Sequence, residues 1–393
     1  MKHAWTLGVE EEYFLVDSET FDAAPTNQLV LRQCDHDGVD ATAEMQACTV
    51  EIGTPVCADA AEVEQAVLQA RRDLADRAAR FGCRLAAVPT HPFAGVGQTI
   101  SDAQRYRAIA DQYGWVADRT MTCGMHVHIG IPNMDHGVTL LNDLRGYAPL
   151  LLALTANSPF VDGIDTGLSS VRNRVGLLYP RQGIPPAVES WDDYELQLRA
   201  LSMAGFVHDH RDLWWAVRLH PTWQTVEVRI CDVQLTANHA AAVAALMQAL
   251  CMFIDEDSPE GGRFAAIPDV LFEENMWSAA RHGTAGQMLD LATLEPGLGG
   301  ATSIPTRVAL ECLVDRLTPF MQRAGNGACI PTLHELIIAN GACRQRAFVE
   351  RDASLVDLMR EIVSKTVEDS ADVSRQPESL APASQDISRP TSC

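Results

Sequence analysis

The sequence predicts an α+β fold with a largely antiparallel sheet, on three observations. Long segments carry apolar residues at every third or fourth position, as surface helices do. Short runs rich in β-branched and aromatic residues lie between them, as strands do. The two kinds of segment do not alternate regularly, which disfavours a doubly wound parallel sheet.

The clearest helix lies between Ala61 and Phe81, where apolar residues recur between charged ones and Gly82 follows. Ser190 followed by Asp193 resembles a capping box before a helix over residues 194–203, and Thr236 is placed to cap an alanine-rich helix. The other expected helices cover residues 238–253, 270–281 and 307–323, and the expected strands cover residues 4–16, 48–52, 84–88, 121–131, 214–219 and 225–231.

We interpret residues 1–368 as a single folded domain and residues 369–393 as a disordered tail. The tail is rich in Ser, Pro, Asp and Gln and has no apolar periodicity. No repeat of fixed period is visible in the remainder, which argues against a solenoid or a propeller.

The composition disfavours several classes of partner. A net charge of -22 without a basic cluster argues against nucleic acid, whose phosphates must be neutralised by Lys and Arg. The most apolar runs, residues 148–155 and 240–254, are shorter than the roughly 20 residues that span a bilayer. The N-terminus lacks the apolar stretch of a secretory signal. We therefore expect a cytoplasmic protein with no membrane and no nucleic-acid partner.

Polar groups inside the expected strands are the most informative feature. Glu10 and Glu12 share one face of the first strand, because side chains alternate with a period of two. For this pattern alone, the alternative is an edge strand with a solvated acidic face. His126 and His128 share a face in the same way. Imidazoles presented like this ligate a metal or contact phosphate, and the alternative is a pair of core histidines.

Two further runs add charged groups. Glu227 and Arg229 point to one side of the last expected strand, where a structural salt-bridge network is the alternative. Glu51 interrupts an apolar run and Glu44 lies upstream of it; a charge inside a strand must be exposed, paired or coordinated. If these faces line one sheet, they form an oxygen-rich cavity that repels itself without cations.

Such a cavity suits Mg²⁺ or Mn²⁺, which in turn bridge nucleotide phosphates. Arg218 and Arg229 are candidates to neutralise phosphoryl oxygens. The sequence contains no G-x-x-x-x-G-K-[ST] motif and no G-x-G-x-x-G after a strand, so a P-loop or a Rossmann turn is not supported. Metals and arginines would have to bind the phosphates.

The chain resembles the YbdK-type carboxylate-amine ligases, also described as glutamate-cysteine ligase type 2, within the glutamine-synthetase-like superfamily. The resemblance covers most of the chain, from Leu7 to about Arg346. The motifs that carry it are Gly8-Val9-Glu10-Glu11-Glu12-Tyr13, Thr90-His91-Pro92-Phe93, Cys123-Gly124-Met125-His126-Val127-His128-Ile129-Gly130, Asn157-Ser158-Pro159-Phe160 with Asp165-Thr166-Gly167, and Thr225-Val226-Glu227-Val228-Arg229-Ile230-Cys231-Asp232.

This resemblance implies a curved, mainly antiparallel sheet flanked by helices, with ATP and metal ions bound in its concave face. It places His128 and Arg229 beside the phosphoryl group, with Arg218 as a further candidate there. The metal ligands that it implies are Glu10, Glu12, Glu44, Glu51, His126 and Glu227.

The activity implied by the resemblance is that of an ADP-forming carboxylate-amine ligase acting in one catalytic domain. The substrate carboxylate attacks the γ-phosphate of ATP, and an amine displaces the resulting acyl phosphate to give an amide. Glutamate is the expected donor and cysteine or another amine the acceptor, Glu51 is a candidate base, and a homodimer is expected. Trp223 departs from the family, whose members usually have a glycine shortly before this strand.

Two other readings of the residues stay open at this point. A metal-dependent amide hydrolase would use the same carboxylates and imidazoles to activate water. A non-catalytic nucleotide-binding relative would keep the cavity without turnover.

Overall fold

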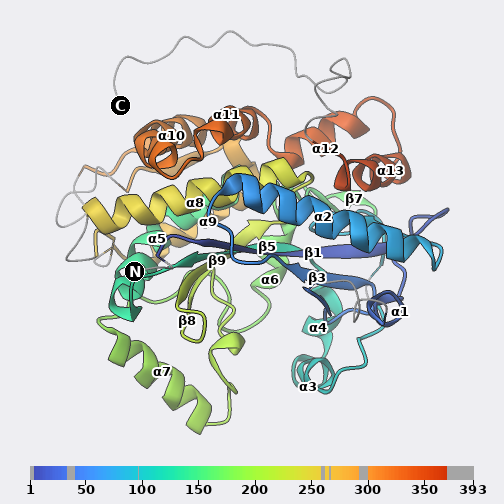
Figure 1. Cartoon of the computed structure of the whole chain (residues 1–393), viewed down its shortest axis with the longest axis horizontal. Helices are drawn as coiled ribbons and strands as arrows, with labels where there is room; N and C mark the ends of the chain where they lie inside the picture. Colours follow the sequence, from blue (N-terminus) through green and yellow to red (C-terminus); the bar gives the residue numbers. More distant parts are fainter. Residues whose placement is uncertain are drawn as a thin grey trace.

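Seven antiparallel strands form the central sheet of the computed structural model, which describes residues 4–32, 40–95, 97–257, 262–264, 267–291 and 300–369 (Figure 1). The strand order is β2-β3-β1-β5-β9-β8, and β4 pairs with the end of β1. The prediction of an α+β fold with an antiparallel sheet is confirmed. The strands are β1 (Leu7–Asp17), β2 (Asp40–Ala43), β3 (Thr49–Gly53), β4 (Cys83–Ala86), β5 (Gly124–Gly130), β8 (Val217–His220) and β9 (Thr225–Asp232).

Two small ribbons lie outside this sheet, and the predicted helices are found within a few residues of their expected bounds. The ribbons pair β6 (Phe160–Val161) with β7 (Ile164–Asp165) and β10 (Gln287–Leu289) with β11 (Ser303–Pro305). The helices predicted from the sequence are α2 (Ala60–Ala79), α7 (Trp191–Met203), α8 (Ala237–Asp257), α9 (Asp269–His282) and α10 (Thr306–Arg323).

Two of these helices begin at the caps that the sequence indicates. The Ser190 hydroxyl accepts a hydrogen bond from the Asp193 amide at 3.1 Å, and the Thr236 hydroxyl accepts one from the His239 amide at 3.3 Å. The helices that the sequence pattern does not predict are α1 (Asn27–Leu31), α3 (Gln104–Tyr113), α4 (Trp115–Arg119), α5 (Met134–Thr155), α6 (Val171–Gly176), α11 (Ile330–Ile338), α12 (Gly341–Val349) and α13 (Leu355–Thr366).

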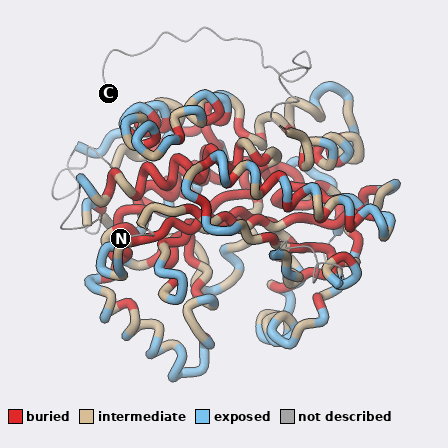
Figure 2. The backbone as a smooth tube through the Cα atoms, viewed as in Figure 1, coloured by how far each residue is buried: buried red, intermediate tan, exposed pale blue. Residues whose placement is uncertain are grey.

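The two faces of the sheet have different surroundings. Alternate strand residues such as Val9, Val127 and Val228 point toward α2, α5 and α8 and build the main apolar core. The helices α2 and α8 lie above the sheet in Figure 1, whereas α3, α4 and α7 project below it. Burial follows this layering, because the sheet and α8 are mostly buried, while nearly all residues of α7 and α3 are of intermediate burial or exposed (Figure 2).

One charged pair sits inside the helix-covered face. Glu11 of β1 and Arg71 of α2 are both fully buried, with Arg71 Nη2 2.9 Å from each carboxylate oxygen. Arg71 also donates to the carbonyls of Gln234 and Leu235 at 2.7 and 2.8 Å, so its charge is well compensated. The pair fixes which face of β1 meets the helices.

The helix α8 is apolar and long enough to cross a membrane, but 89% of its apolar window is buried inside the protein. It is therefore a core helix, as expected for the run at residues 240–254. The tail predicted over residues 369–393 lies outside the described residues apart from Asp369.

Candidate active site

The strand register brings the predicted site residues together on the face opposite α2 and α8. Glu10 lies opposite His126 across β1 and β5, and Glu12 lies opposite Glu51 across β1 and β3. His128 lies opposite Glu227 across β5 and β9. Directly opposed side chains on one face are about 5 Å apart, so these pairings alone form a cluster.

Three overlapping groups of ligand atoms result, each with its atoms within 4.8 Å of one another. Glu10 and Glu51 each belong to two of them, so the groups form a continuous row along the sheet. The groups are Glu10 with Glu51 and His126, Glu10 with His128 and Glu227, and Glu12 with Glu44 and Glu51. All six predicted metal ligands, together with His128, are thus brought together.

The row contains carboxylates with opposite electrostatic surroundings. Burial would raise the pKa of Glu10, but hydrogen bonds and charges from His126 and His128 hold that pKa well below its usual range. Burial, and then the charge of Glu12, raises the pKa of Glu44 to about 7. Burial, and then Glu44 and its other carboxylate neighbours, raises the pKa of Glu51 well above its usual range. The Glu44–Glu51 end therefore lacks compensating positive charge.

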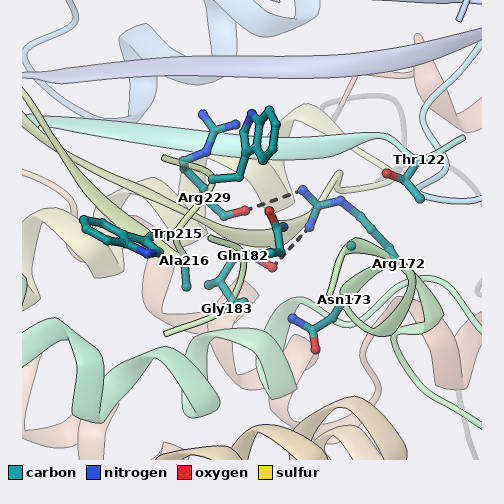
Figure 3. A pocket seen from close by; sticks show the side chains of 11 residues that line it. Thr122, Arg172, Asn173, Gln182, Gly183, Trp215, Ala216 and Arg229 are labelled. Carbon is teal, nitrogen blue, oxygen red and sulfur yellow. Dashed lines mark hydrogen bonds between the residues drawn. The ribbon is translucent and has the colours of Figure 1, made fainter. Parts of the chain in front are cut away.

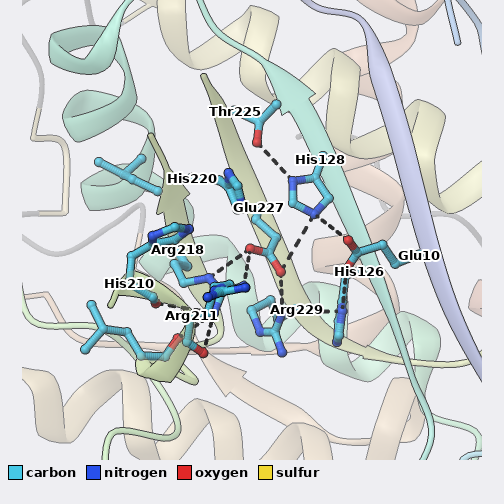
Figure 4. Close-up of polar contacts among 12 residues, drawn as sticks. Glu10, His126, His128, His210, Arg211, Arg218, His220, Thr225, Glu227 and Arg229 are labelled. Atoms are coloured by element: carbon cyan, nitrogen blue, oxygen red, sulfur yellow. Dashed lines mark hydrogen bonds and ion pairs between the residues drawn. The ribbon is translucent and has the colours of Figure 1, made fainter. Parts of the chain in front are cut away.

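At the other end, Glu227 lies between two arginines (Figure 4). Arg218 Nε and Nη2 lie 2.9 and 2.7 Å from Glu227 Oε2, and Arg229 Nη1 pairs with Oε1. Burial would raise the pKa of Glu227, yet these two guanidinium groups hold it well below its usual range. Arg229 Nη1 also lies 3.4 Å from Nδ1 of His126, and its side chain is 19% exposed. Arg229 is therefore ion-paired on one side and partly accessible to a ligand on the other.

Arg218 is more enclosed than Arg229. Its side chain is 6% exposed, and Nη1 donates to the backbone carbonyls of Arg211 and Leu213 at 3.0 and 3.2 Å. With Nε and Nη2 directed to Glu227, these contacts favour a role in holding that carboxylate. The place of Arg218 beside the phosphoryl group stays a prediction.

A row of rings continues beyond His128. His128 Nδ1 lies 2.9 Å from the Thr225 hydroxyl, while Nε2 is 3.5 Å from Glu10 Oε1 and 3.8 Å from Glu227 Oε1. The indole of Trp223 stands 5.0 Å from the His128 ring and stacks on His220 at 4.1 Å. Trp223 stands out in the sequence only as a departure from the family pattern, and His220 was not predicted from the sequence.

A bulge in β9 aims Arg229 into a pocket. Met125 pairs with Cys231 and Val127 with Val228, so Arg229 and Ile230 are both opposite a single residue of β5. The pocket holds about 370 Å³ of empty space, part of it open to solvent (Figure 3). Its lining is Thr122, Arg172, Asn173, Gly176, Gln182, Gly183, Trp214, Trp215, Ala216, Arg229 and Ile230, with two arginines and no acidic side chain.

Arg172 of α6 was not predicted from the sequence. Its Nη1 and Nη2 donate long hydrogen bonds to the carbonyls of Ile230 and Arg229, at 3.3 and 3.5 Å. Asp232 lies 3.8 Å from Nη1 and is itself held by Ser158 and Ser170, at 2.8 and 3.0 Å. Arg172 therefore braces the bulge and adds positive charge to the pocket.

Two other motifs support the site from outside it. The ring of His91 is buried, with Nε2 2.9 Å from the Phe21 carbonyl and Nδ1 accepting from the Ala94 amide at 2.9 Å. The Asn157 amide donates to Asp232 at 2.8 Å, and its side chain donates to the Val233 carbonyl at 2.8 Å. These motifs fix loops rather than contact the row of carboxylates.

Comparison with known sequences identifies the family. The sequence model described as "Glutamate-cysteine ligase family 2 (GCS2)" matches residues 6–369. The chain belongs to glutamate-cysteine ligase family 2. It is 36% identical over 366 residues to a "Putative glutamate–cysteine ligase 2-3" of Rubrobacter xylanophilus, covering 92% of this chain and 97% of that one. A "Putative glutamate–cysteine ligase 2" of Gloeobacter violaceus is 32% identical over 362 residues, covering 91% and 95%.

Solved structures show the same fold at low sequence identity. A glutamate–cysteine ligase of Francisella tularensis, in complex with AMP, has a TM-score of 0.68 and 12% identity, over 94% of this chain and 91% of that one. A bifunctional glutathione synthetase of Pasteurella multocida has a TM-score of 0.64 and 14% identity, over 92% of this chain and 52% of that one. The predictions of this family, its fold and an ATP-dependent carboxylate-amine ligase are confirmed for this family 2 member.

Proposed function

We propose that this family 2 ligase joins the γ-carboxylate of glutamate to cysteine or a similar amine, with ATP cleaved to ADP and phosphate. The observation that carries the proposal is the row of ligand groups from Glu44 to Glu227, which ends at Arg229 and opens into a cationic pocket. Ligation through an acyl phosphate needs this combination of cation ligands, a guanidinium that can reach the phosphate and room for an anionic substrate.

The residues present fit divalent magnesium or manganese. Carboxylate oxygens dominate the donor set, which also holds the two imidazoles of His126 and His128, and the carboxylates of Glu44 and Glu51 repel one another without a cation. His126 and Glu51 belong to the middle group of the row. When bound, the cations would neutralise phosphate oxygens and favour their transfer.

We assign roles in the reaction to four side chains of the site. Arg229 orients the transferring phosphoryl group and neutralises charge that develops on it. Glu227 fixes Arg229 by an ion pair, and the β9 bulge sets its direction. His128 contacts the phosphate side, held by Thr225 at 2.9 Å. Glu51 is the candidate base for the amine, in the deprotonated form that a bound cation would favour over the protonated form of the metal-free site.

The pocket is the proposed site of the carboxylate substrate. Its arginines supply positive charge, and Asn173 and Gln182 supply amide groups for the polar end of an amino acid. A carboxylate held there beside Arg229 is placed to attack the γ-phosphate, and the oxygen that it contributes becomes part of the acyl phosphate.

Phosphate release tests the proposal. Purified protein with ATP and Mg²⁺ would be screened against glutamate and a panel of amines that includes cysteine. We expect phosphate and an amide product only when ATP, glutamate and an amine are all present. Amide turnover without ATP would favour the hydrolase alternative, and nucleotide binding without turnover for any pair would favour the non-catalytic relative.

Four finer features are also proposed. We infer one catalytic domain over residues 1–368, a cytoplasmic location, a requirement for Mg²⁺ or Mn²⁺, and a homodimer that binds neither nucleic acid nor membrane. Light scattering of the full chain measures the oligomer, and turnover with and without a chelator measures the metal requirement.

A further inference from the structure

Trp223 combines exposure with a fixed position beside the site. It is 57% exposed and lies in the turn between β8 and β9. One side of the indole stacks on His220, with ring centroids 4.1 Å apart and planes 15° from parallel. Its contact with His128 is edge-on, at 5.0 Å and 67°. The stack with His220 thus covers one face of the indole, and the exposure leaves room for a ligand ring against the other.

The turn that carries Trp223 is held in place by its neighbour. Gln224 has a φ of 53°, in the left-handed region that non-glycine residues rarely adopt. Its side-chain amide donates to the carbonyls of Ile131 and Pro132, both at 2.9 Å. The Trp223 amide also donates to Nδ1 of His220 at 3.2 Å. The indole is therefore positioned before any ligand arrives.

The two ends of the candidate site along β9 differ in chemistry. Trp223, Glu227 and Arg229 follow one another toward the pocket, and a strand rises about 3.3 Å per residue. The six residue steps from Trp223 to Arg229 therefore span at most about 20 Å. The Glu10–His128–Glu227 group lies between these two residues. The pocket end is polar and cationic, whereas the Trp223 end offers an aromatic face.

We propose that Trp223, backed by His220, is the stacking platform for the purine base of the nucleotide. This proposal rests on the proposed function, because it needs phosphates beside His128 and Arg229. A nucleotide with its phosphates there extends its base toward one end of the row. Stacking on an indole suits a purine, whereas the polar pocket suits the small amino-acid substrate.

Paired ligands with and without a base test the platform directly. Binding of ADP and of inorganic tripolyphosphate would be measured by calorimetry, with Mg²⁺, on the full chain and its variants. We expect Trp223→Ala to weaken ADP binding about 10-fold or more and to leave tripolyphosphate binding unchanged. Trp223→Phe keeps a ring and retains most of the ADP affinity. Trp115→Ala is the matched control, since Trp115 is 61% exposed on α4, and it changes neither ligand.

Two results would overturn the platform. One is an unchanged ADP affinity in Trp223→Ala, with or without a raised KM for the amine, and the other is an equal loss of affinity for both ligands. If wild-type protein binds neither ADP nor tripolyphosphate, the proposed function fails, and the platform fails with it. Circular dichroism of each variant separates these results from misfolding, and ADP-dependent quenching of fluorescence in wild type but not in Trp223→Phe gives a second readout.

Discussion

Arg172 crosses directly over Gly124, at the start of β5. A Cβ built on Gly124 would lie 2.0 Å from Nη2 of Arg172 and 2.7 Å from its Cζ. A Cβ at the glycine of the G-M-H-x-H strand would thus fit only if the Arg172 guanidinium moved aside. Because Arg172 braces the carbonyls of Arg229 and Ile230, the geometry at Gly124 reaches the candidate catalytic arginine.

Gly124→Ala should therefore displace Arg172 and lower activity. Because the atoms that must move are the flexible end of a side chain, we expect little change in stability and a fall in kcat of at least about 10-fold. Chemical denaturation and phosphate release measure the two effects. Gly53→Ala is the matched control, since a Cβ there meets Asp40 at an ordinary 3.7 Å. Equal kcat in the two alanine variants would contradict the link.

Glu227→Gln should abolish Mg²⁺-dependent ATP turnover. It leaves Arg218 and Arg229 without their carboxylate, at a cost to folding of about 3 kcal/mol. Glu11→Gln is matched to it, because Glu11 is an equally buried carboxylate paired with an arginine on the opposite face. We expect both variants to unfold earlier in urea and only Glu227→Gln to lose turnover. Full activity in Glu227→Gln would show that Glu227 is not needed in the proposed metal site.

Arg229→Lys and Arg218→Lys should separate catalysis from support. Lysine cannot reproduce the two-sided contacts of a guanidinium. We expect Arg229→Lys to lower kcat about 100-fold with little change in the unfolding midpoint. Arg218→Lys loses contacts to Glu227 and to backbone carbonyls, so its unfolding midpoint should fall. A normal midpoint with a raised KM for ATP in Arg218→Lys would instead place it at the phosphates.

Metal affinity should rise with pH between about 5.5 and 8. The raised pKa values of Glu44, about 7, and of Glu51 keep protons on the metal-free site, and a cation must displace them. Because the pKa of Glu44 is raised from its usual 4.5 to about 7, the protonated carboxyl group stabilises the metal-free fold at low pH, and this stability is lost as pH rises through about 7. A bound cation offsets this loss. Mn²⁺ titrations in two buffers of different ionisation enthalpy count the released protons. In Glu44→Gln the pH dependence should flatten, and an unaltered profile would contradict the assignment.

The sequence predicted the clustering of the candidate site residues better than it predicted the helices. The period-two spacing of Glu10 and Glu12, and of His126 and His128, places each pair on one face whatever the exact ends of the strand. The resemblance supplied their partners on other strands. By contrast, α5 was missed because it is buried on nearly all sides and so has no amphipathic pattern. Gly137, Gly146 and Pro149 inside it further obscure the helix.

Arg172 and His220 could not be predicted in the same way. Arg172 comes from a six-residue helix, and its place depends on a glycine 48 positions earlier and on the β9 bulge, neither of which leaves a periodic signal. His220 enters the site through contacts with Trp223 and with the His128 ring, neither of which the sequence pattern indicates. Trp223 did stand out as a departure from the family pattern. This is the one local signal in the sequence that could have led to the Trp223–His220 ring pair.

The alternation of Glu10, Glu11 and Glu12 along β1 also guards against misalignment during folding. A register shift of one residue would turn Glu10 and Glu12 toward the apolar helix layer, where Arg71 can pair with only one of them. The same shift would remove Glu10 from the row of candidate ligands. Both effects disfavour a wrongly aligned chain, so these three glutamates also help to specify the pairing register of β1.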